Sequence, residues 1–347
     1  MMLSIIVPVY NTPYDLVKRL MDSVAQQGEE DLEVIIVDDG SNSSYGAEID
    51  NLGQDYNFPV QVHHQQNCGV SAARNAGVEL SSGDYIIFAD GDDILAPGFI
   101  KKAYSIAEKE NVDVVFGKLG RFFEGDELPH DSAEHSYTVI GDKDIDKLKV
   151  SILGGISADL DYRLEGSPCG RLIKREVAVN IRFPEEVRYF EDQIYNRVLL
   201  NGISSAAVTN DIYYYYIQRR DSAMHSNYGN KSFYGKIKPY WNELARLNVS
   251  ESGAVKERAS INILNEYIIF IHMALIGAGV KITEGRKLLM EAAENPAIVN
   301  GLDYIEKKKP LLTKKEKLTY SLLRKKQYLI LWLIVWCNRK MHGDRFY

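Results

Sequence analysis

Cysteine is scarce in this sequence. The three cysteines, Cys68, Cys169 and Cys337, lie far apart among 347 residues. They lack the close spacing of a zinc site or of a disulfide framework. We therefore expect free thiols and a location in the reducing cytoplasm.

Long apolar runs and an excess of positive charge are missing as well. No run reaches the roughly 18 to 20 apolar residues of a membrane-spanning helix. The apolar N-terminus, residues 3–9, has no basic leader and is too short for a secretory signal, which favours a strand. The net charge of −7 argues against nucleic acid as a partner, because such binders normally present a basic surface.

Short segments rich in β-branched or aromatic residues follow one another in the first third of the chain. Most of them are separated by segments with helical spacing, such as residues 97–109. They cover residues 3–9, 32–37, 59–64, 84–88 and 112–116. This alternation predicts an α/β fold built on a parallel sheet.

The rest of the chain follows a different pattern. Residues 118–160 are irregular and acidic, which predicts a loop-rich region over the sheet. After residue 230 the pattern becomes helical. We therefore expect an α/β domain over residues 1–225 and a helical region over residues 226–347.

Polar clusters follow three of the predicted strands. The first strand ends in Tyr10-Asn11, the second in Asp38-Asp39-Gly40-Ser41, and the fourth in Asp90-Gly91-Asp92-Asp93. In a parallel sheet the carboxyl ends of the strands share one edge, where helix N-termini and loop amides converge on ligands. We therefore expect the three clusters to lie side by side.

The turn Asp90 to Asp93 places three carboxylates within four residues. Such like charges repel one another unless water or a cation neutralises them. Mg²⁺ and Mn²⁺ take one or two carboxylates together with water and phosphate oxygens. The turn thus indicates a divalent metal site, and an ordinary acidic turn before the next helix is an open alternative.

Three further features have both a functional and a plain structural interpretation. Asp38 and Asp39 can accept hydrogen bonds from a nucleoside or can simply form a turn. Arg74 lies among small residues that open a predicted helix, where it is either a functional residue or a solvated surface side chain. Glu191 and Asp192 precede an apolar helix, whose N-terminus favours acids in any case.

Taken together and in this order, these motifs resemble glycosyltransferase family two, whose members are inverting enzymes with the GT-A fold. The resemblance covers roughly residues 3–220. The segments that carry it are Ser4–Asn11, Val37–Ser41, Asn67–Gly77, Gly83–Asp93 and Phe190–Asp192. It implies an α/β fold with a mixed, Rossmann-like sheet flanked by helices and followed by a helical C-terminal region.

The resemblance also implies roles for individual residues. Asp192 is expected to be the catalytic base, with Glu191 as the second candidate. Asp90 and Asp92 are expected to hold Mn²⁺ or Mg²⁺, and Asp93 and His225 are further metal candidates. Residues 213–222 resemble an aromatic and basic segment that closes over the diphosphate. The expected nucleotide-sugar contacts are Pro8, Val9, Tyr10, Asn11, Asp38, Asp39, Arg74, Asp90, Gly91, Arg219 and Arg220.

The implied reaction is the transfer of a sugar, with inversion, from a nucleoside-diphosphate sugar, expected to be a UDP-sugar. Residues 1–117 would bind this donor, and residues 118–225 would bind a saccharide or lipid-linked saccharide acceptor, as in the synthesis of a bacterial cell-surface polysaccharide. A sugar nucleotidyltransferase is one alternative, but the glycine-rich loop of that class is missing after the first strand. A non-catalytic nucleotide-sugar or carbohydrate-binding module is another, against which the intact aspartates argue.

The C-terminal residues form a basic tail over 313–347. Between Lys307 and Tyr347 there are twelve Lys or Arg residues and two acids. Tyr328 to Cys337 are almost entirely apolar, too few to span a bilayer. An apolar segment between cationic flanks suits a helix that lies on an anionic inner membrane leaflet. A buried helix or an oligomer contact is the alternative.

Overall fold

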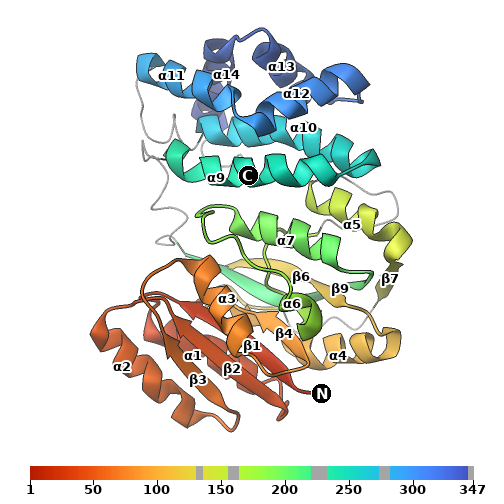
Figure 1. Cartoon of the computed structure of the whole chain (residues 1–347). Coiled ribbons are helices and arrows are strands. Elements are labelled where there is room, and N and C mark those ends of the chain that lie inside the picture. The colour runs from red at the N-terminus through yellow and green to blue at the C-terminus, as the bar shows by residue number, and fades with distance from the viewer. Residues whose placement is uncertain (130–135, 155–163, 220–232, 273–281, 343–347) are drawn as a thin grey trace. The chain divides into compact units, whose positions relative to one another are not determined.

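The computed structural model describes residues 1–129, 136–154, 164–219, 233–272 and 282–342, and Figure 1 traces the chain. The chain divides into two compact units. The first comprises Met1–Ile152 and Ile156–Arg219, and the second comprises Leu153–Gly155 and Arg220–Tyr347. The boundary that we expected between residues 225 and 226 lies outside the described residues.

The first unit is built on a mixed sheet of nine strands within the described ranges, in the order β3-β2-β1-β4-β8-β6-β9-β5, with β7 paired to β9. One half of the sheet is parallel. There β1 (Leu3–Val9) lies between β2 (Leu32–Asp38) and β4 (Tyr85–Phe88), and β3 (Val60–His64) lies at the edge. These strands confirm the predictions over residues 3–9, 32–37, 59–64 and 84–88.

The other half of the sheet is mixed, so the parallel pattern that the alternation predicts holds only for the first half. β8 (Arg171–Lys174) runs antiparallel between β4 and β6 (Val114–Phe123), and β6 pairs in parallel with β9 (Ser205–Gln218), which confirms the mixed sheet that the resemblance implied. β5 (Ile94–Leu95) and β7 (Tyr137–Gly141) pair antiparallel with β9. The strand predicted at 112–116 is therefore separated from β4 by a strand that comes much later in the chain.

Helices cover the sheet of the first unit. α3 packs against β1 and β2, and α4 packs against β6, β8 and β9. Gly77 lets α3 approach closely, because a Cβ there would lie 2.3 Å from Ile6 Cγ2. The helices are α1 (Tyr14–Ala25), α2 (Ser43–Leu52), α3 (Val70–Leu80), α4 (Phe99–Glu110), α5 (Ile145–Ile152), α6 (Arg175–Ala178) and α7 (Glu191–Gly202).

The loop-rich region expected over residues 118–160 is largely regular where the structure describes it. β6 continues to Phe123, and β7 and α5 follow. Gly117 and Gly120 lie in β6, where their lack of a side chain serves the pairing of this strand with β9. A Cβ on Gly117 would lie 2.2 Å from the Tyr213 ring. Close strand packing therefore overrides the local preference of glycine for turns.

The second unit is helical, as predicted for the residues after 230. α10 packs against α12 and α13, and α9 packs against α12. Trp241 and Phe270 are buried there, with ring centroids 5.3 Å apart. Its helices are α9 (Phe233–Ser250), α10 (Gly253–Phe270), α11 (Ile282–Ala293), α12 (Pro296–Lys308), α13 (Lys314–Arg324) and α14 (Tyr328–His342).

The predicted apolar segment of the basic tail forms α14, which is packed on one side only. Leu331 and Val335 are buried, whereas Ile330, Leu333 and Trp336 are 46%, 45% and 38% exposed. α14 contacts α11 and α13 of the same unit. In the part of the chain that the structure describes, no helix has both the length and the apolar composition of a membrane span.

Candidate functional site

The three predicted polar clusters lie at one edge of the sheet. β1 pairs in parallel with both β2 and β4, so the carboxyl ends of all three strands point the same way. Tyr10 and Asn11 follow β1, Gly40 and Ser41 follow the end of β2, and Asp90 to Asp93 follow β4. The edge is where ligands bind in open α/β sheets.

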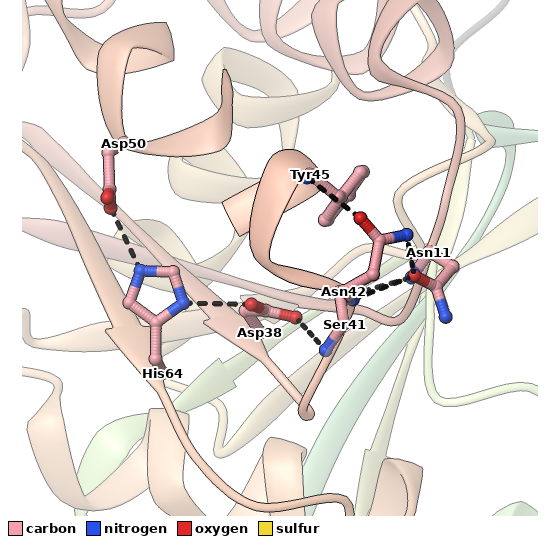
Figure 2. Close-up of polar contacts among 7 residues, drawn as sticks. All are labelled: Asn11, Asp38, Ser41, Asn42, Tyr45, Asp50 and His64. Carbon is pink, nitrogen blue, oxygen red and sulfur yellow. Dashed lines mark hydrogen bonds and ion pairs between the residues drawn. The ribbon is translucent and has the colours of Figure 1, made fainter. Parts of the chain in front are cut away.

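Asn11 joins the first two clusters, as Figure 2 shows. Its φ of 48° is left-handed, a conformation that asparagine tolerates better than most residues. The Asn11 N–H donates to Ser41 Oγ at 2.8 Å, and Asn11 Oδ1 accepts from the Asn42 N–H at 3.1 Å. Asn42 in turn caps α2, because its Oδ1 accepts from the Tyr45 N–H. The turns after β1 and β2 are therefore held together.

Asp38 and Asp39 lie beneath this surface, 3% and 4% exposed. Asp38 Oδ1 accepts from the Ser41 N–H at 3.0 Å. Asp39 Oδ1 accepts from the Cys68 N–H at 2.8 Å, and its Oδ2 accepts from the Gly69 N–H at 2.7 Å. Asp39 thus fixes the loop that leads into α3, and its contact with a nucleoside stays a prediction.

The other expected nucleotide contacts differ in what they can offer a ligand. Tyr10 is 55% exposed, and Pro8 is half-buried within β1. Val9 is buried in the apolar core, and Gly91 lies against it, because a Cβ on Gly91 would lie 3.0 Å from Val9 Cγ1. Val9 and Gly91 can therefore meet a ligand through their backbone only.

Two arginines neutralise the acidic turn after β4. Arg74 Nη2 lies 2.8 Å from Asp90 Oδ1, and Arg219 Nη2 lies 2.9 Å from Asp92 Oδ2. The Asp90 N–H also donates to the Tyr214 hydroxyl at 2.8 Å. The turn is therefore braced from α3 on one side and from β9 on the other.

Asp93 differs from its neighbours in this turn. It is 1% exposed, and its Oδ1 accepts from the Ile217 N–H of β9 at 2.9 Å. Burial and then the charges of Asp90 and Asp92 raise the pKa of Asp93 to about 8. This position favours a bracing role, and metal binding by Asp93 stays a prediction.

Arg74 also reaches the second acidic motif. Its Nη1 lies 3.1 Å from Glu191 Oε1 in the first turn of α7, and its guanidinium lies 5.2 Å from the centre of the Phe183 ring. With 4% of its surface exposed, Arg74 is a buried bridge between Asp90 and Glu191. The alternative of a solvated surface arginine is therefore wrong.

Asp192 follows Glu191 in the first turn of α7. Its Oδ1 accepts from the Gln193 N–H at 2.8 Å. Burial and then the charge of Glu191 raise the pKa of Asp192, the Gln193 N–H and Arg74 act in the opposite direction, and the net pKa is about 7. A carboxyl group with such a pKa can take up and release a proton near neutral pH.

The residues present fit a divalent cation bound jointly with a substrate. Asp90 and Asp92 each have one oxygen on an arginine, and their side chains are still 34% and 32% exposed. Among the described residues no three His, Cys, Asp or Glu side chains form a metal site by themselves. Mg²⁺ and Mn²⁺ need no such cage, because water and substrate phosphates complete their coordination.

Sequence reasoning placed the tyrosine run incorrectly. Residues 213–216 lie within β9, where Tyr213, Tyr214 and Tyr215 are at most 4% exposed, so they do not close over a ligand. Arg219 reaches the site at Asp92 by its side-chain charge, while Tyr214 and Ile217 meet Asp90 and Asp93 through hydrogen bonds. Arg220 and His225 lie outside the described residues.

His64 is a residue that sequence reasoning missed. It ends β3 at the same sheet edge and lines a shallow pocket of about 380 Å³ together with Asp38, Ser41 and Asp50. The polar triplet His63-His64-Gln65 at the end of a predicted strand was the available signal. The same rule that selected the three other clusters would have selected this one.

A mixed α/β sheet with an acidic turn and a neighbouring Glu-Asp pair at its ligand edge is the arrangement of a glycosyltransferase. A family model described as glycosyl transferase family 2 matches residues 4–178, half of the chain. The chain belongs to this family. The enzyme class expected from the five motifs is therefore confirmed, against the alternatives of a nucleotidyltransferase and a binding module.

Similar proteins include bacterial glycosyltransferases. Glycosyltransferase GlyG of Streptococcus pneumoniae is 29% identical over 232 residues, which are 65% of this chain and 74% of that protein. A poly(ribitol-phosphate) beta-glucosyltransferase of Bacillus spizizenii is 25% identical over 82% of this chain and 43% of its own length. The chain thus spans less than half of the latter enzyme.

Solved structures share the fold. Residues 1–349 of Staphylococcus aureus TarS give a TM-score of 0.67 at 20% identity, with 100% of this chain and 93% of that chain covered. The same part of TarS has been solved with UDP and with UDP-GlcNAc. This likeness confirms the expected GT-A architecture with a helical region after it.

Proposed function

We propose that this glycosyltransferase moves a sugar from a UDP-sugar to a hydroxyl of a saccharide or lipid-linked saccharide, with inversion, in the synthesis of a cell-surface polysaccharide. The observation that carries the proposal is the Arg74 bridge, which brings the acidic turn of Asp90 and the Glu191-Asp192 pair to one place. The names of the relatives and the UDP complexes of TarS support the donor and the acceptor class.

The residues of the chain divide the chemistry. Asp192 takes the proton of the acceptor hydroxyl as that oxygen attacks the anomeric carbon, an assistance worth about a hundred- to ten-thousand-fold in rate. Asp90 and Asp92 would hold Mn²⁺ or Mg²⁺. The bound ion stabilises negative charge on a departing diphosphate. Arg219, beside Asp92, adds a positive charge on the same side.

The proposal is tested by incubating the chain with UDP-glucose, UDP-galactose, UDP-N-acetylglucosamine and GDP-mannose, with and without saccharide acceptors. We expect release of UDP from one UDP-sugar, loss of release with EDTA, and recovery with Mn²⁺ or Mg²⁺. The anomeric configuration of the product, read by NMR, should be opposite to that of the donor. Release that EDTA leaves unchanged would contradict the metal, and a retained configuration would contradict the inversion.

A second observation favours attachment to a membrane surface. The exposed face of α14 carries Ile330, Leu333 and Trp336, and exposed Lys325, Lys326 and Lys340 flank it. Apolar side chains between cations suit the interface of an anionic bilayer, where each nearby Lys or Arg contributes about 1 kcal/mol. We infer that α14 holds the enzyme at such a surface, close to a lipid-linked acceptor.

Vesicle sedimentation tests this attachment. We expect the chain to bind phosphatidylglycerol vesicles and not phosphatidylcholine vesicles, and the triple change Ile330→Ser, Leu333→Ser and Trp336→Ser to abolish binding. Val249→Ser is the control, because Val249 is 73% exposed on α9. If the triple variant binds as well as the wild type, or if it instead dissociates an oligomer seen by light scattering, the membrane assignment fails.

A further inference from the structure

His64 joins two acidic side chains from different elements, as Figure 2 shows. His64 Nδ1 lies 2.8 Å from Asp38 Oδ2 at the end of β2, and His64 Nε2 lies 2.9 Å from Asp50 Oδ1 on α2. A neutral imidazole has one N–H, whereas the imidazolium has two. Both contacts are therefore hydrogen bonds only when His64 is protonated.

The hydrogen bonds continue from His64 to the end of β1. Asp38 presents its second oxygen to the Ser41 N–H, and Ser41 Oγ accepts from the Asn11 N–H. Asn11 directly follows Tyr10, which is 55% exposed at the ligand edge. An interaction on α2, at Asp50, is thus connected through His64 and Asp38 to the surface formed by the turns after β1 and β2.

The charges around the ring explain why it is held. Asp38 faces it from β2 and Asp50 faces it from α2, while Gly46 of α2 leaves room, since a Cβ there would lie 3.4 Å from His64 Cε1. Tyr45 of α2 also feels the charge of Asp38. β3, which carries His64, is an edge strand of the sheet. The contacts with Asp50 and then Asp38 raise the pKa of His64, and its partial burial opposes them.

We propose that His64 is a positioning residue for the donor: by clamping Asp38 to Asp50, it holds the Asp38–Ser41 turn and Asn11 in the shape that receives the nucleotide. This inference rests on the proposed function, because it takes the ends of β1 and β2 as the nucleotide surface. His64 touches neither substrate nor metal in this scheme. Its effect should therefore appear in donor affinity and not in turnover.

The test compares His64→Gln with the matched control His63→Gln. Neighbouring residues of a strand face opposite sides, so His63 lies outside the clamp. Titration calorimetry with UDP should show about tenfold or greater loss of affinity for His64→Gln, the size of one lost charged hydrogen bond, and no change for His63→Gln. Wild-type kcat should persist in both variants at saturating donor.

The pH dependence provides a readout that a merely structural role would not move. Because the pKa of His64 is raised in the folded protein, the clamp is complete below the ordinary histidine pKa and is lost as pH rises through the raised value. UDP affinity of the wild type should fall over that interval, and that of His64→Gln should stay flat. Asp50→Asn, at a side chain 56% exposed, should shift the fall to lower pH without unfolding the protein.

Each outcome decides the question. Equal UDP affinity for wild type and His64→Gln, or an NMR titration of His64 that Asp50→Asn leaves unchanged, would overturn the clamp and leave the proposed function intact. If the wild type binds no nucleoside diphosphate at all, the proposed function fails and the clamp fails with it.

Discussion

Asp39 and Asp192 are aspartates of the same unit, yet their surroundings differ in kind. Asp39 is buried against backbone N–H groups of the loop before α3, which satisfy both of its oxygens. Asp192 is half-buried beside another carboxylate, and its pKa rises to about 7. The carboxylate of Asp39 is fixed by the backbone and builds the surface around it. The other is kept near the point of protonation, which suits chemistry and costs stability.

The largest expected effect is on the turnover of an Asp192 variant. Asp192→Asn keeps the shape of the side chain but cannot accept a proton, so we expect the rate of transfer to fall by about a hundred- to ten-thousand-fold. The UDP affinity measured by calorimetry should stay within about threefold of the wild type, because nucleotide binding is assigned to the cluster that contains Asp39. Wild-type turnover in this variant would contradict the assignment of catalysis to Asp192 and of nucleotide binding to the cluster that contains Asp39.

Among the residues around Asp90 and Glu191, Arg74 should contribute most to the stability of the fold. Arg74→Met leaves Asp90 and Glu191, whose side chains are 34% and 14% exposed, without their shared cation, and we expect a loss of about 1 to 3 kcal/mol, below that of a fully buried pair. Chemical denaturation measures this loss. Arg182→Met is the control, because that arginine pairs with Glu79 and Glu185 at the surface, where such pairs contribute about 1 kcal/mol or less. Equal losses in both variants would contradict the bridge.

Removing the charge should change the free energy of unfolding in opposite directions at Asp192 and Asp39. The pKa of Asp192 is raised from 3.8 to about 7, so its contribution to stability is complete below pH 3.8 and is lost as pH rises through 7. Asp192→Asn should therefore be more stable than the wild type at pH 8, by about 1 to 3 kcal/mol, and equally stable near pH 4.

Asp39→Asn should instead destabilise the fold at both pH values. An amide NH₂ would face backbone N–H groups that have lost their acceptor, a loss of about 1 to 3 kcal/mol. Thermal melting of the two variants at pH 4 and pH 8 measures the contrast. If Asp39→Asn stabilised the protein, the claim that backbone N–H groups hold the Asp39 carboxylate in place would be wrong.

The parallel half of the fold could be predicted because its signals are local. β1, β2 and β4 are short apolar runs, each followed by a polar cluster, so pattern and position agree. The mixed half could not be predicted in the same way. The start of β6 lies in the strand predicted at 112–116, but its continuation past Gly117 and Gly120 to Phe123 accompanies the close approach of the Tyr213 ring of β9 to Gly117, which no local pattern reports.

The same difference separates the parts of the site. Asp90, Asp92 and Asp192 could be selected from short motifs. The contact of Arg74 with Glu191 joins residues 117 positions apart, and that of Tyr214 with Asp90 joins residues 124 apart. Such contacts exist only in the folded chain, and no periodicity reports them. They are nevertheless what holds the acidic turn in place.

The 14 residues of β9 have a consequence for the way this enzyme can diversify. Tyr214, Ile217 and, just beyond the strand, Arg219 meet Asp90, Asp93 and Asp92 in turn. Since side chains alternate along a strand, inserting or deleting one residue would exchange its two faces and disconnect these contacts together. Segments before Ser205 can vary in length without this penalty. In chimeras built to change acceptor specificity, the segment taken from a relative should therefore end before Ser205, and the length of β9 should stay unchanged.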